Sequence, residues 1–201
     1  MYQNIIFDIG GVLLSWNPEK FVETILSDKA DIQYFADIIF KSKDWKELDR
    51  SSYSIEFLKN LYMKKNPLIK NEINLLLDNW IDLLQPINEN VSLIHKLKNY
   101  GYKLYVISNY VKEAFEEKNK KHDFFKLFDG MIISCYVDFI KPEIEIYKLL
   151  LEKYSLKANE CVFIDDSKNN TEAAEKIGIT SITYKSHQQL LDQLTKFNLK
   201  F

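Results

Sequence analysis

The sequence predicts an α/β fold, a doubly wound parallel sheet of about five strands with an inserted helical-bundle cap domain. Two observations support this fold class. Short apolar runs alternate with helical patterns over the second half of the chain, as in sheets built from βαβ units. The first two apolar runs, however, are separated by roughly 95 residues, where a crossover of about a dozen residues would suffice. The excess length predicts an inserted domain.

Five runs rich in Ile, Val, Phe and Tyr are the expected strands. They are Asn4 to Phe7, Lys103 to Ile107, Gly130 to Ser134, Cys161 to Ile164 and Thr180 to Thr183. Helical patterns lie between the later runs. They are Glu89 to Tyr100, Val111 to Asn119, Pro142 to Tyr154 and Asn170 to Ile177. Gly101 and Gly178 follow two of these patterns and are typical helix stops, while Pro142 suits a first helical turn.

The long connection after the first strand is helical throughout. Its apolar residues recur at spacings of three and four, which is the pattern of amphipathic helices. The expected helices are Pro18 to Leu26, Ile32 to Phe40, Trp45 to Leu48, Ile55 to Met63 and Ile69 to Leu84. We therefore predict a cap domain over residues 15–86 and a core domain over residues 1–14 and 87–201. The cap would lie over the carboxyl ends of the strands, where such sheets bind ligands.

Composition and charge argue against several classes of partner. The chain of 201 residues has 27 Lys and Arg against 29 Asp and Glu, so no net field favours nucleic acid or a membrane surface. Cys135 and Cys161 lie in apolar stretches, which suits a reducing compartment. The sequence contains neither a recognisable signal peptide nor an apolar run of about 18 residues. We expect a cytoplasmic monomer or homodimer that acts on a small molecule.

Polar side chains with complementary chemistry stand at or beyond the ends of the predicted strands. They are Asp8, Ser108, Asn109, Lys141, Asp165 and Asp166. The carboxyl ends of parallel strands meet at one edge of a sheet, so these groups should converge. Together they suit phosphoryl transfer: carboxylates from two strands can hold Mg²⁺, Asp8 can attack phosphorus, and Ser108 and Lys141 can stabilise the phosphoryl oxygens.

These residues carry a family resemblance. The segments FDIGGVLL, VISN, Lys141-Pro142-Glu143 and FIDDSKNN resemble, in order, the four motifs of the haloacid dehalogenase-like hydrolases. The resemblance implies a Rossmann-like core, the helical cap of the family's first cap type, and a Mg²⁺-dependent phosphatase. Within the family, the chain is similar to a subgroup that includes sugar-phosphate phosphatases and the phosphatase domains of soluble epoxide hydrolases. A hexose phosphate is therefore the expected substrate.

The resemblance also implies roles for individual residues. Asp8 would be the nucleophile and a metal ligand, and the backbone carbonyl of Gly10 and the carboxylate of Asp166 would complete the direct ligands. Asp165 and Asn170 would orient the metal-bound waters. From the cap, Trp45, Asp49 and Arg50 are candidates for binding the substrate. Packing within the cap explains Trp45 and Arg50 equally well.

The sequence departs from the family at Gly10. Phosphatases of the family usually have there a second Asp, which protonates the leaving alcohol and later activates water. Its loss could cost about 10²–10⁴-fold in rate. Water could replace it, or Asp49 could, if cap closure brought its carboxylate over the leaving group; equally, Asp49 could be a surface residue at a helix end. Two other functions remain open, a non-catalytic phosphate-binding or regulatory protein, and a 2-haloacid dehalogenase, against which the Asp165-Asp166 pair argues.

Overall fold

The computed structural model of the protein describes residues 1–26 and 31–201. The described chain contains a five-stranded, fully parallel sheet in the order β3-β2-β1-β4-β5. The strands are β1 (Asn4–Phe7), β2 (Lys103–Ser108), β3 (Gly130–Ile133), β4 (Cys161–Asp165) and β5 (Thr180–Thr183). The predicted α/β fold class is confirmed. Because β1 is central, and Phe7 pairs with Val106 on one side and Ile164 on the other, Asp8 lies between the ends of β2 and β4.

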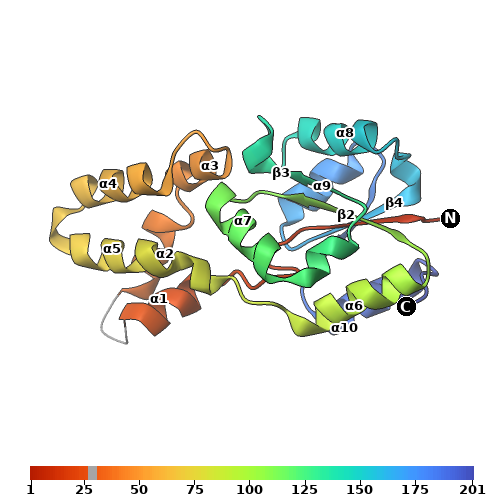
Figure 1. Cartoon of the computed structure of the whole chain (residues 1–201), viewed down its shortest axis with the longest axis horizontal. Helices are drawn as coiled ribbons and strands as arrows, with labels where there is room; N and C mark the ends of the chain where they lie inside the picture. Colours follow the sequence, from red (N-terminus) through yellow and green to blue (C-terminus); the bar gives the residue numbers. More distant parts are fainter. Residues whose placement is uncertain (27–30) are drawn as a thin grey trace.

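Helices cover both faces of the sheet (Figure 1). They are α6 (Asn88–Asn99), α7 (Lys112–Lys121), α8 (Ile144–Lys153), α9 (Lys168–Glu175) and α10 (His187–Lys196). Alternate residues of a strand point to opposite faces. Ile5 therefore packs in one apolar cluster with α6 and α10, whereas Ile6 packs in another with α8 and α9. Burial on both faces explains why the strands are nearly continuous apolar runs.

The segment between β1 and α6 forms the separate lobe at the left of Figure 1. Its helices are α1 (Pro18–Leu26), α2 (Ile32–Ile39), α3 (Lys43–Asp49), α4 (Ile55–Lys65) and α5 (Lys70–Asn79). Helix α1 packs against α2, and α4 against α5. The side chains of Asp31, Ser42 and Ser54 cap α2, α3 and α4 by accepting backbone N–H bonds, as expected of these residue types.

Two chain crossings join the lobes. Leu14 bridges Pro86, the Ser15 N–H donates to the carbonyl of Gln85 at 2.7 Å, and the Ile87 N–H donates to the carbonyl of Leu13 at 2.9 Å. The predicted boundaries between cap and core, at residues 14 and 87, fall among these paired residues. The domain boundaries stay a prediction, and residues 27–30 of the predicted cap lie outside the described residues.

Several element boundaries differ from the sequence-based expectation. The helix expected over Ile69 to Leu84 is shorter, because 3-10 turns at Pro67–Ile69 and Trp80–Leu83 flank α5. Pro142 lies before α8 rather than in its first turn, and the helix begins at Ile144. Helix α10 was not expected; Ser186 caps it by accepting a bond from the Gln189 N–H.

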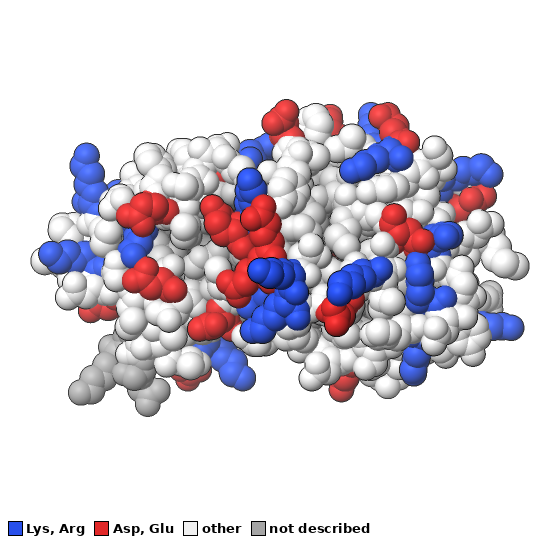
Figure 2. Space-filling model, viewed as in Figure 1, with Lys and Arg blue, Asp and Glu red and all other residues white. Residues whose placement is uncertain are grey.

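The surface carries no extended field of one sign on the face seen in Figure 2, where Lys and Arg side chains lie beside Asp and Glu side chains over both lobes. Among the residues that the structure describes, no helix has the length and apolar character needed to cross a membrane. The expected absence of nucleic-acid partners, the oligomeric state and the cytoplasmic location stay predictions.

Candidate active site

Asp8 directly follows the central strand β1 and is 7% exposed. Its backbone N–H continues the sheet by donating to the carbonyl of Ile164 at 2.9 Å. Its Oδ1 atom accepts bonds from the Ser108 hydroxyl at 2.7 Å and from the Ile9 N–H at 2.7 Å, and lies 2.7 Å from Nζ of Lys141. Three donors thus fix the orientation of this carboxylate. In the described residues, no hydrogen bond or ion pair engages Oδ2.

Lys141 is a buried ammonium between two carboxylates. Its Nζ lies 2.6 Å from Oδ2 of Asp165 as well as 2.7 Å from Oδ1 of Asp8. Asn109 holds its backbone reciprocally: the Lys141 N–H donates to Oδ1 of Asn109 at 2.7 Å, and Nδ2 of Asn109 donates to the Lys141 carbonyl at 2.9 Å. Asn109 therefore positions Lys141, and its amide is already engaged by that backbone.

Asp165 organises the loop after β4 and is completely buried. It accepts bonds from the Ser167 N–H at 2.8 Å and from Nδ2 of Asn170 at 2.9 Å, in addition to its ion pair with Lys141. These bonds tie the start of α9 to the end of the strand. The next residue, Asp166, is the more exposed of the pair and lines the cavity described below.

The carboxylates of Asp8, Asp165 and Asp166 form a candidate site for a hard divalent cation. One oxygen from each of Asp8, Asp165 and Asp166 lies within 4.8 Å of the others. Lys141 balances only one of the three negative charges, so a divalent cation would compensate the surplus. Carboxylate oxygens are also the ligands that Mg²⁺ prefers. The donor chemistry therefore fits the predicted metal.

Gly11 contributes to this place by its lack of a side chain. Its φ is +73°, and a Cβ atom there would lie 2.3 Å from Oδ2 of Asp166. The backbone thus approaches the carboxylate more closely than any other residue would allow. Gly10 differs, because a Cβ atom there would meet its nearest neighbour, Cβ of Trp16, only at 4.0 Å.

The electrostatics of the cluster follow from burial and mutual repulsion. Burial raises the pKa of Asp8 to about 8; Lys141 opposes this shift and Asp165 adds to it. Burial also raises the pKa of Asp166, with Asp165 contributing. For Lys141, burial lowers the pKa, but Asp165 and Asp8 more than offset this and raise it, so the ammonium stays charged. A cation among the carboxylates would favour their ionised forms.

The cap places Asp49, the last residue of α3, over the cavity. Its backbone carbonyl accepts a bond from the Ser134 hydroxyl at 2.6 Å, and the same hydroxyl accepts from the Tyr110 N–H at 2.9 Å. Burial raises the pKa of the Asp49 side chain to about 7, although the cations of Lys141 and Lys46 oppose the shift. Asp49 is thus a half-buried carboxyl that titrates near neutrality.

Arg50 does not line the cavity. Its guanidinium instead pairs with the carboxylate of Glu143 in the core and donates to the carbonyl of Asp138 at 3.2 Å. These contacts point the side chain away from the cavity. Together with the bond between Ser134 and Asp49, they fasten the end of α3 to the core.

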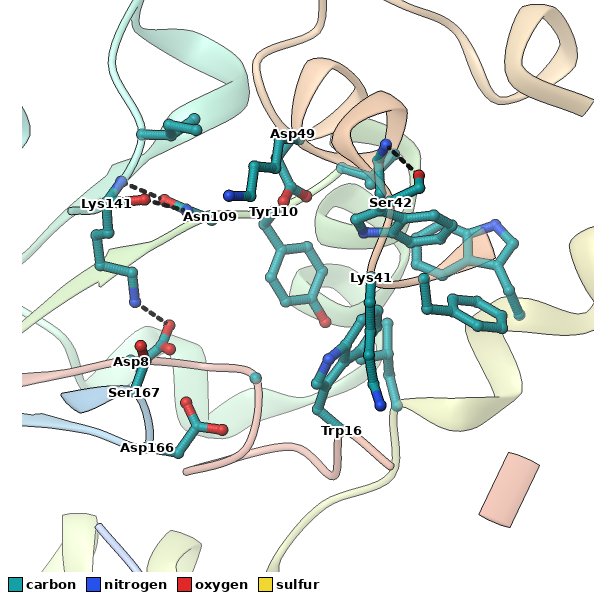
Figure 3. Close-up of a pocket in the computed structure, with 18 residues that line it drawn as sticks. Asp8, Trp16, Lys41, Ser42, Asp49, Asn109, Tyr110, Lys141, Asp166 and Ser167 are labelled. Atoms are coloured by element: carbon teal, nitrogen blue, oxygen red, sulfur yellow. Dashed lines mark hydrogen bonds and ion pairs between the residues drawn. The ribbon is translucent and has the colours of Figure 1, made fainter. Parts of the chain in front are cut away.

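A cavity of about 320 Å³ lies between the lobes. Its core side includes Asp8, Gly10, Asn109, Tyr110, Val111, Ile140, Lys141, Asp166 and Ser167, and its cap side includes Trp16, Phe40, Lys41, Ser42, Trp45, Lys46, Asp49, Trp80 and Leu84. In Figure 3, Tyr110 and Asp49 lie between Asp8 on one side and Trp16 and Ser42 on the other.

The structure brings most of the sequence-predicted residues to one place. Asp8, Gly10, Trp45, Asp49, Asn109, Lys141 and Asp166 line the cavity. Ser108, Asp165 and Asn170 do not line it but contact its members. Sequence reasoning missed Tyr110, Ser134, Trp16 and Trp80. Only Tyr110 had a usable signal, since it directly follows Ser108-Asn109 at a strand end.

Comparison with known proteins shows the family of the chain. The family model of haloacid dehalogenase-like hydrolases matches residues 2–178. The sesquiterpene phosphatase astK of Aspergillus oryzae is 27% identical over 90% of this chain and 89% of its own length. The phosphorylated carbohydrates phosphatase of Thermotoga maritima is 33% identical over 43% of this chain and 40% of its own.

A similar fold occurs in a solved structure, an enzyme of the same family from Bacteroides thetaiotaomicron in complex with magnesium and inorganic phosphate. It superposes with a TM-score of 0.72 at 22% identity, covering 92% of this chain and 95% of that one. At this identity the likeness bears on the fold.

Proposed function

The chain belongs to the haloacid dehalogenase-like hydrolases, and on that basis we propose that it is a Mg²⁺-dependent phosphatase of small phosphate monoesters, with Asp8 as nucleophile. The observation that carries the proposal is the arrangement around Asp8. Ser108, Lys141 and the Ile9 N–H converge on Oδ1, while Asp165 and Asp166 place two more carboxylates beside it. Such a set serves phosphoryl transfer better than attack on carbon, which needs no cation.

The reaction would proceed in two displacements. Oδ2 of Asp8, which the donors leave free, attacks phosphorus; the bond from phosphorus to the ester oxygen breaks, and the leaving oxygen takes a proton. Water then attacks the aspartyl-phosphate, which releases inorganic phosphate and restores the Asp8 carboxylate. Lys141 and the Ser108 hydroxyl, both within reach of Asp8, would stabilise the phosphoryl oxygens as their charge redistributes.

Magnesium would be held by Asp8 and Asp166 directly, with the backbone carbonyl of Gly10 as the family resemblance implies. Asp165 and Asn170, joined by a 2.9 Å bond, would orient its waters. When bound, the ion would neutralise the repulsion between the Asp8 carboxylate and the anionic ester.

Asp49 is the group we assign to proton transfer in place of the family's usual Asp, for which Gly10 stands here. Its carboxyl lines the cavity with Asp8, and the 2.6 Å bond from Ser134 holds its backbone. A carboxyl whose pKa burial raises to about 7 suits an acid that donates to a leaving alcohol and later acts as a base toward water. Protonation by solvent water is the competing explanation.

The experiment is hydrolysis of p-nitrophenyl phosphate by the purified chain. We expect activity with Mg²⁺, loss of activity with a chelator and its return on adding Mg²⁺. Asp8→Asn should abolish turnover, whereas Asp192→Asn, which changes an exposed carboxylate on α10, should not. Inactivity of the metal-loaded chain toward this ester and toward sugar phosphates and nucleotides would instead support the phosphate-binding alternative.

The relatives do not agree on a substrate. One is named for sesquiterpenes and another for phosphorylated carbohydrates. A sugar phosphate, expected from the subgroup resemblance, is thus one of at least two classes that fit the proposed reaction. The lining of the cavity bears on the choice.

A further inference from the structure

The cap side of the cavity is an aromatic wall. All three tryptophans of the chain line it, together with Phe40. The ring centroids of Trp45 lie 5.2 Å from those of Trp80, 5.9 Å from Trp16 and 5.0 Å from Phe40. Leu84 on the same side and Ile140 on the core side add aliphatic surface. Substrate bound between Asp8 and this wall would leave water for an apolar surface, which favours hydrophobic groups.

Several polar groups in the same lining are already engaged. The Ser42 hydroxyl accepts a bond from the Trp45 N–H and bonds with the Tyr62 hydroxyl. Lys41 pairs with Glu19 and Asp37, and Asn109 is engaged by the Lys141 backbone. A sugar ring needs a partner for each hydroxyl that it buries, and an unpaired one is costly. On the cap side, the Lys46 and Asp49 side chains and the indole N–H groups remain for this role.

The Tyr110 hydroxyl marks where a polar end of the ligand would lie. Among the described residues, three buried side-chain atoms lack a hydrogen-bond partner, and of their residues only Tyr110 lines the cavity. Tyr110 is 5% exposed, its hydroxyl oxygen is buried, and in Figure 3 the hydroxyl points away from Asp8, toward Trp16 on the cap side. Burial raises the pKa of Tyr110, with the Asp8 charge adding to the shift, so the hydroxyl stays a neutral donor. Buried hydroxyls are normally paired, and an oxygen of a bound phosphate ester would supply the acceptor.

From this arrangement we propose that the substrate is the phosphate monoester of a hydrophobic alcohol, whose alkyl, alkenyl or aryl group lies against the tryptophans. The proposal rests on the phosphatase function above and names its substrate class. The phosphoryl group lies at Asp8, Tyr110 donates to an oxygen of the ester, and the hydrocarbon fills the remaining space. The volume, about 320 Å³, is near the lower end of the roughly 300–1,000 Å³ of ligand sites, so a single chain or ring system of modest size fits.

Binding can be measured by tryptophan fluorescence, without turnover, because all three tryptophans line this cavity. The probes are n-alkylphosphonic acids from methyl to decyl, kept below their micelle concentrations with Mg²⁺ present; their C–P bond removes hydrolysis from the measurement. Each added methylene should tighten binding about threefold to fourfold until the cavity is full. Affinity independent of chain length would overturn the proposal.

Variants locate the effect. Trp16 is half-buried, so Trp16→Ala should fold and should weaken decylphosphonic acid about tenfold, the loss of roughly two buried methylenes, with little change for methylphosphonic acid. Tyr110→Phe should weaken all members of the series equally, since it removes a donor at the polar end. Phe57→Ala is the matched control, because Phe57 is 50% exposed on α4 and lies outside the cavity. Equal weakening by Phe57→Ala and Trp16→Ala would contradict the assignment.

Turnover separates this proposal from the proposed function. The enzyme should prefer octyl phosphate to glucose 6-phosphate by at least tenfold in kcat/KM. Hydrolysis of p-nitrophenyl phosphate together with a preference for the sugar ester would reject the hydrophobic substrate and keep the phosphatase. Chain-length-dependent binding without hydrolysis of any ester would reject the phosphatase, and with it the claim that the bound compound is a substrate.

Discussion

The Ser134 hydroxyl donates a 2.6 Å hydrogen bond to the backbone carbonyl of Asp49, across 85 residues of sequence. Ser134 directly follows β3 and Asp49 ends α3 of the cap, so this bond joins the two lobes at the cavity. Because the same hydroxyl accepts from the Tyr110 N–H, the Ser134 side chain ties the Asp49 backbone to the loop that carries Tyr110. The position of Asp49 over the phosphate site therefore depends on the docking of the cap.

Asp49→Asn should reduce hydrolysis of alkyl phosphates far more than that of p-nitrophenyl phosphate. An alkoxide needs a proton to leave, whereas nitrophenolate does not, and loss of a general acid costs about 10²–10⁴-fold. In the parent enzyme, phosphoryl transfer from an alkyl ester should fall as pH rises above about 7, where Asp49 loses its proton. The Asp49→Asn variant should not show this decrease in rate above about pH 7. An unchanged pH profile of single-turnover rates would exclude Asp49 as the acid.

The same substitution should stabilise the fold at neutral pH. The folded-state pKa of Asp49 is raised above its ordinary value of 3.8 to about 7 by burial, so between these pH values the folded state binds the proton more tightly than the unfolded state. Stability due to this group is then lost as pH rises from about 4 to 7. Asp49→Asn removes the loss, and its Tm relative to the parent should rise over that interval. A relative Tm that is flat with pH would contradict the buried carboxyl.

Gly10→Asp should raise the rate for alkyl esters in the Asp49→Asn background. The space beside Gly10 is open, because a Cβ atom would meet its nearest neighbour at 4.0 Å, and position 10 lines the cavity with Asp8. A carboxyl there would supply the acid that the family usually has. Gly10→Asn serves as the control of equal size without the proton. If the two substitutions had equal effects on kcat, proton transfer from this position would be excluded.

The strands and the core site residues could be predicted because each depends on local pattern. β1 and β4 are short apolar runs followed by acidic residues, and a parallel sheet necessarily brings their carboxyl ends together. Asp8, Lys141 and Asp165 thus met as expected. The family resemblance further separated Asp165 from Asp166 in role, and in the structure the first is buried and the second lines the cavity.

The cap side could not be predicted because it depends on tertiary docking. Trp16 and Trp80 lie near opposite ends of the inserted segment. They line the same cavity only because the two ends of that segment pair with each other where it joins the core. Arg50 was a candidate for binding the substrate because of its charge. The sequence does not show that its guanidinium forms an ion pair with Glu143, which is distant along the chain. Asp49 had two interpretations, a helix-end surface residue or a cavity carboxyl, and its place in the cavity lining favours the second.

Lys141→Met should destabilise the protein by about 3–5 kcal/mol, the cost of leaving buried charges without their partner. Asp8 and Asp165 both lose the ammonium that lies within 2.7 Å of them, and activity should be lost too. Chemical denaturation measures the stability. Burial raises the pKa of Asp8 to about 8, and its protonation relieves the repulsion with Asp165, so the deficit should shrink as pH falls. Lys103→Met is the control, because Lys103 forms a surface ion pair with Asp129, and such pairs contribute about 0–1 kcal/mol.

Gly11→Ala should lower p-nitrophenyl phosphate hydrolysis strongly, leaving a folded protein with measurable residual activity at high Mg²⁺. The added methyl would meet Oδ2 of Asp166 at 2.3 Å, so the Asp166 carboxylate has to leave its present position in the cluster. The positive φ adds a cost of roughly 1–2 kcal/mol for a residue with a side chain. Apparent Mg²⁺ affinity, measured from the Mg²⁺ dependence of p-nitrophenyl phosphate hydrolysis in a Gly11→Ser and Gly11→Ala pair, should fall in both variants. Gly101→Ala controls for backbone strain alone, since Gly101 also has a positive φ but no atom within 4 Å of an added Cβ. If Gly101→Ala lost as much metal affinity as Gly11→Ala, the close approach to Asp166 would not be the cause.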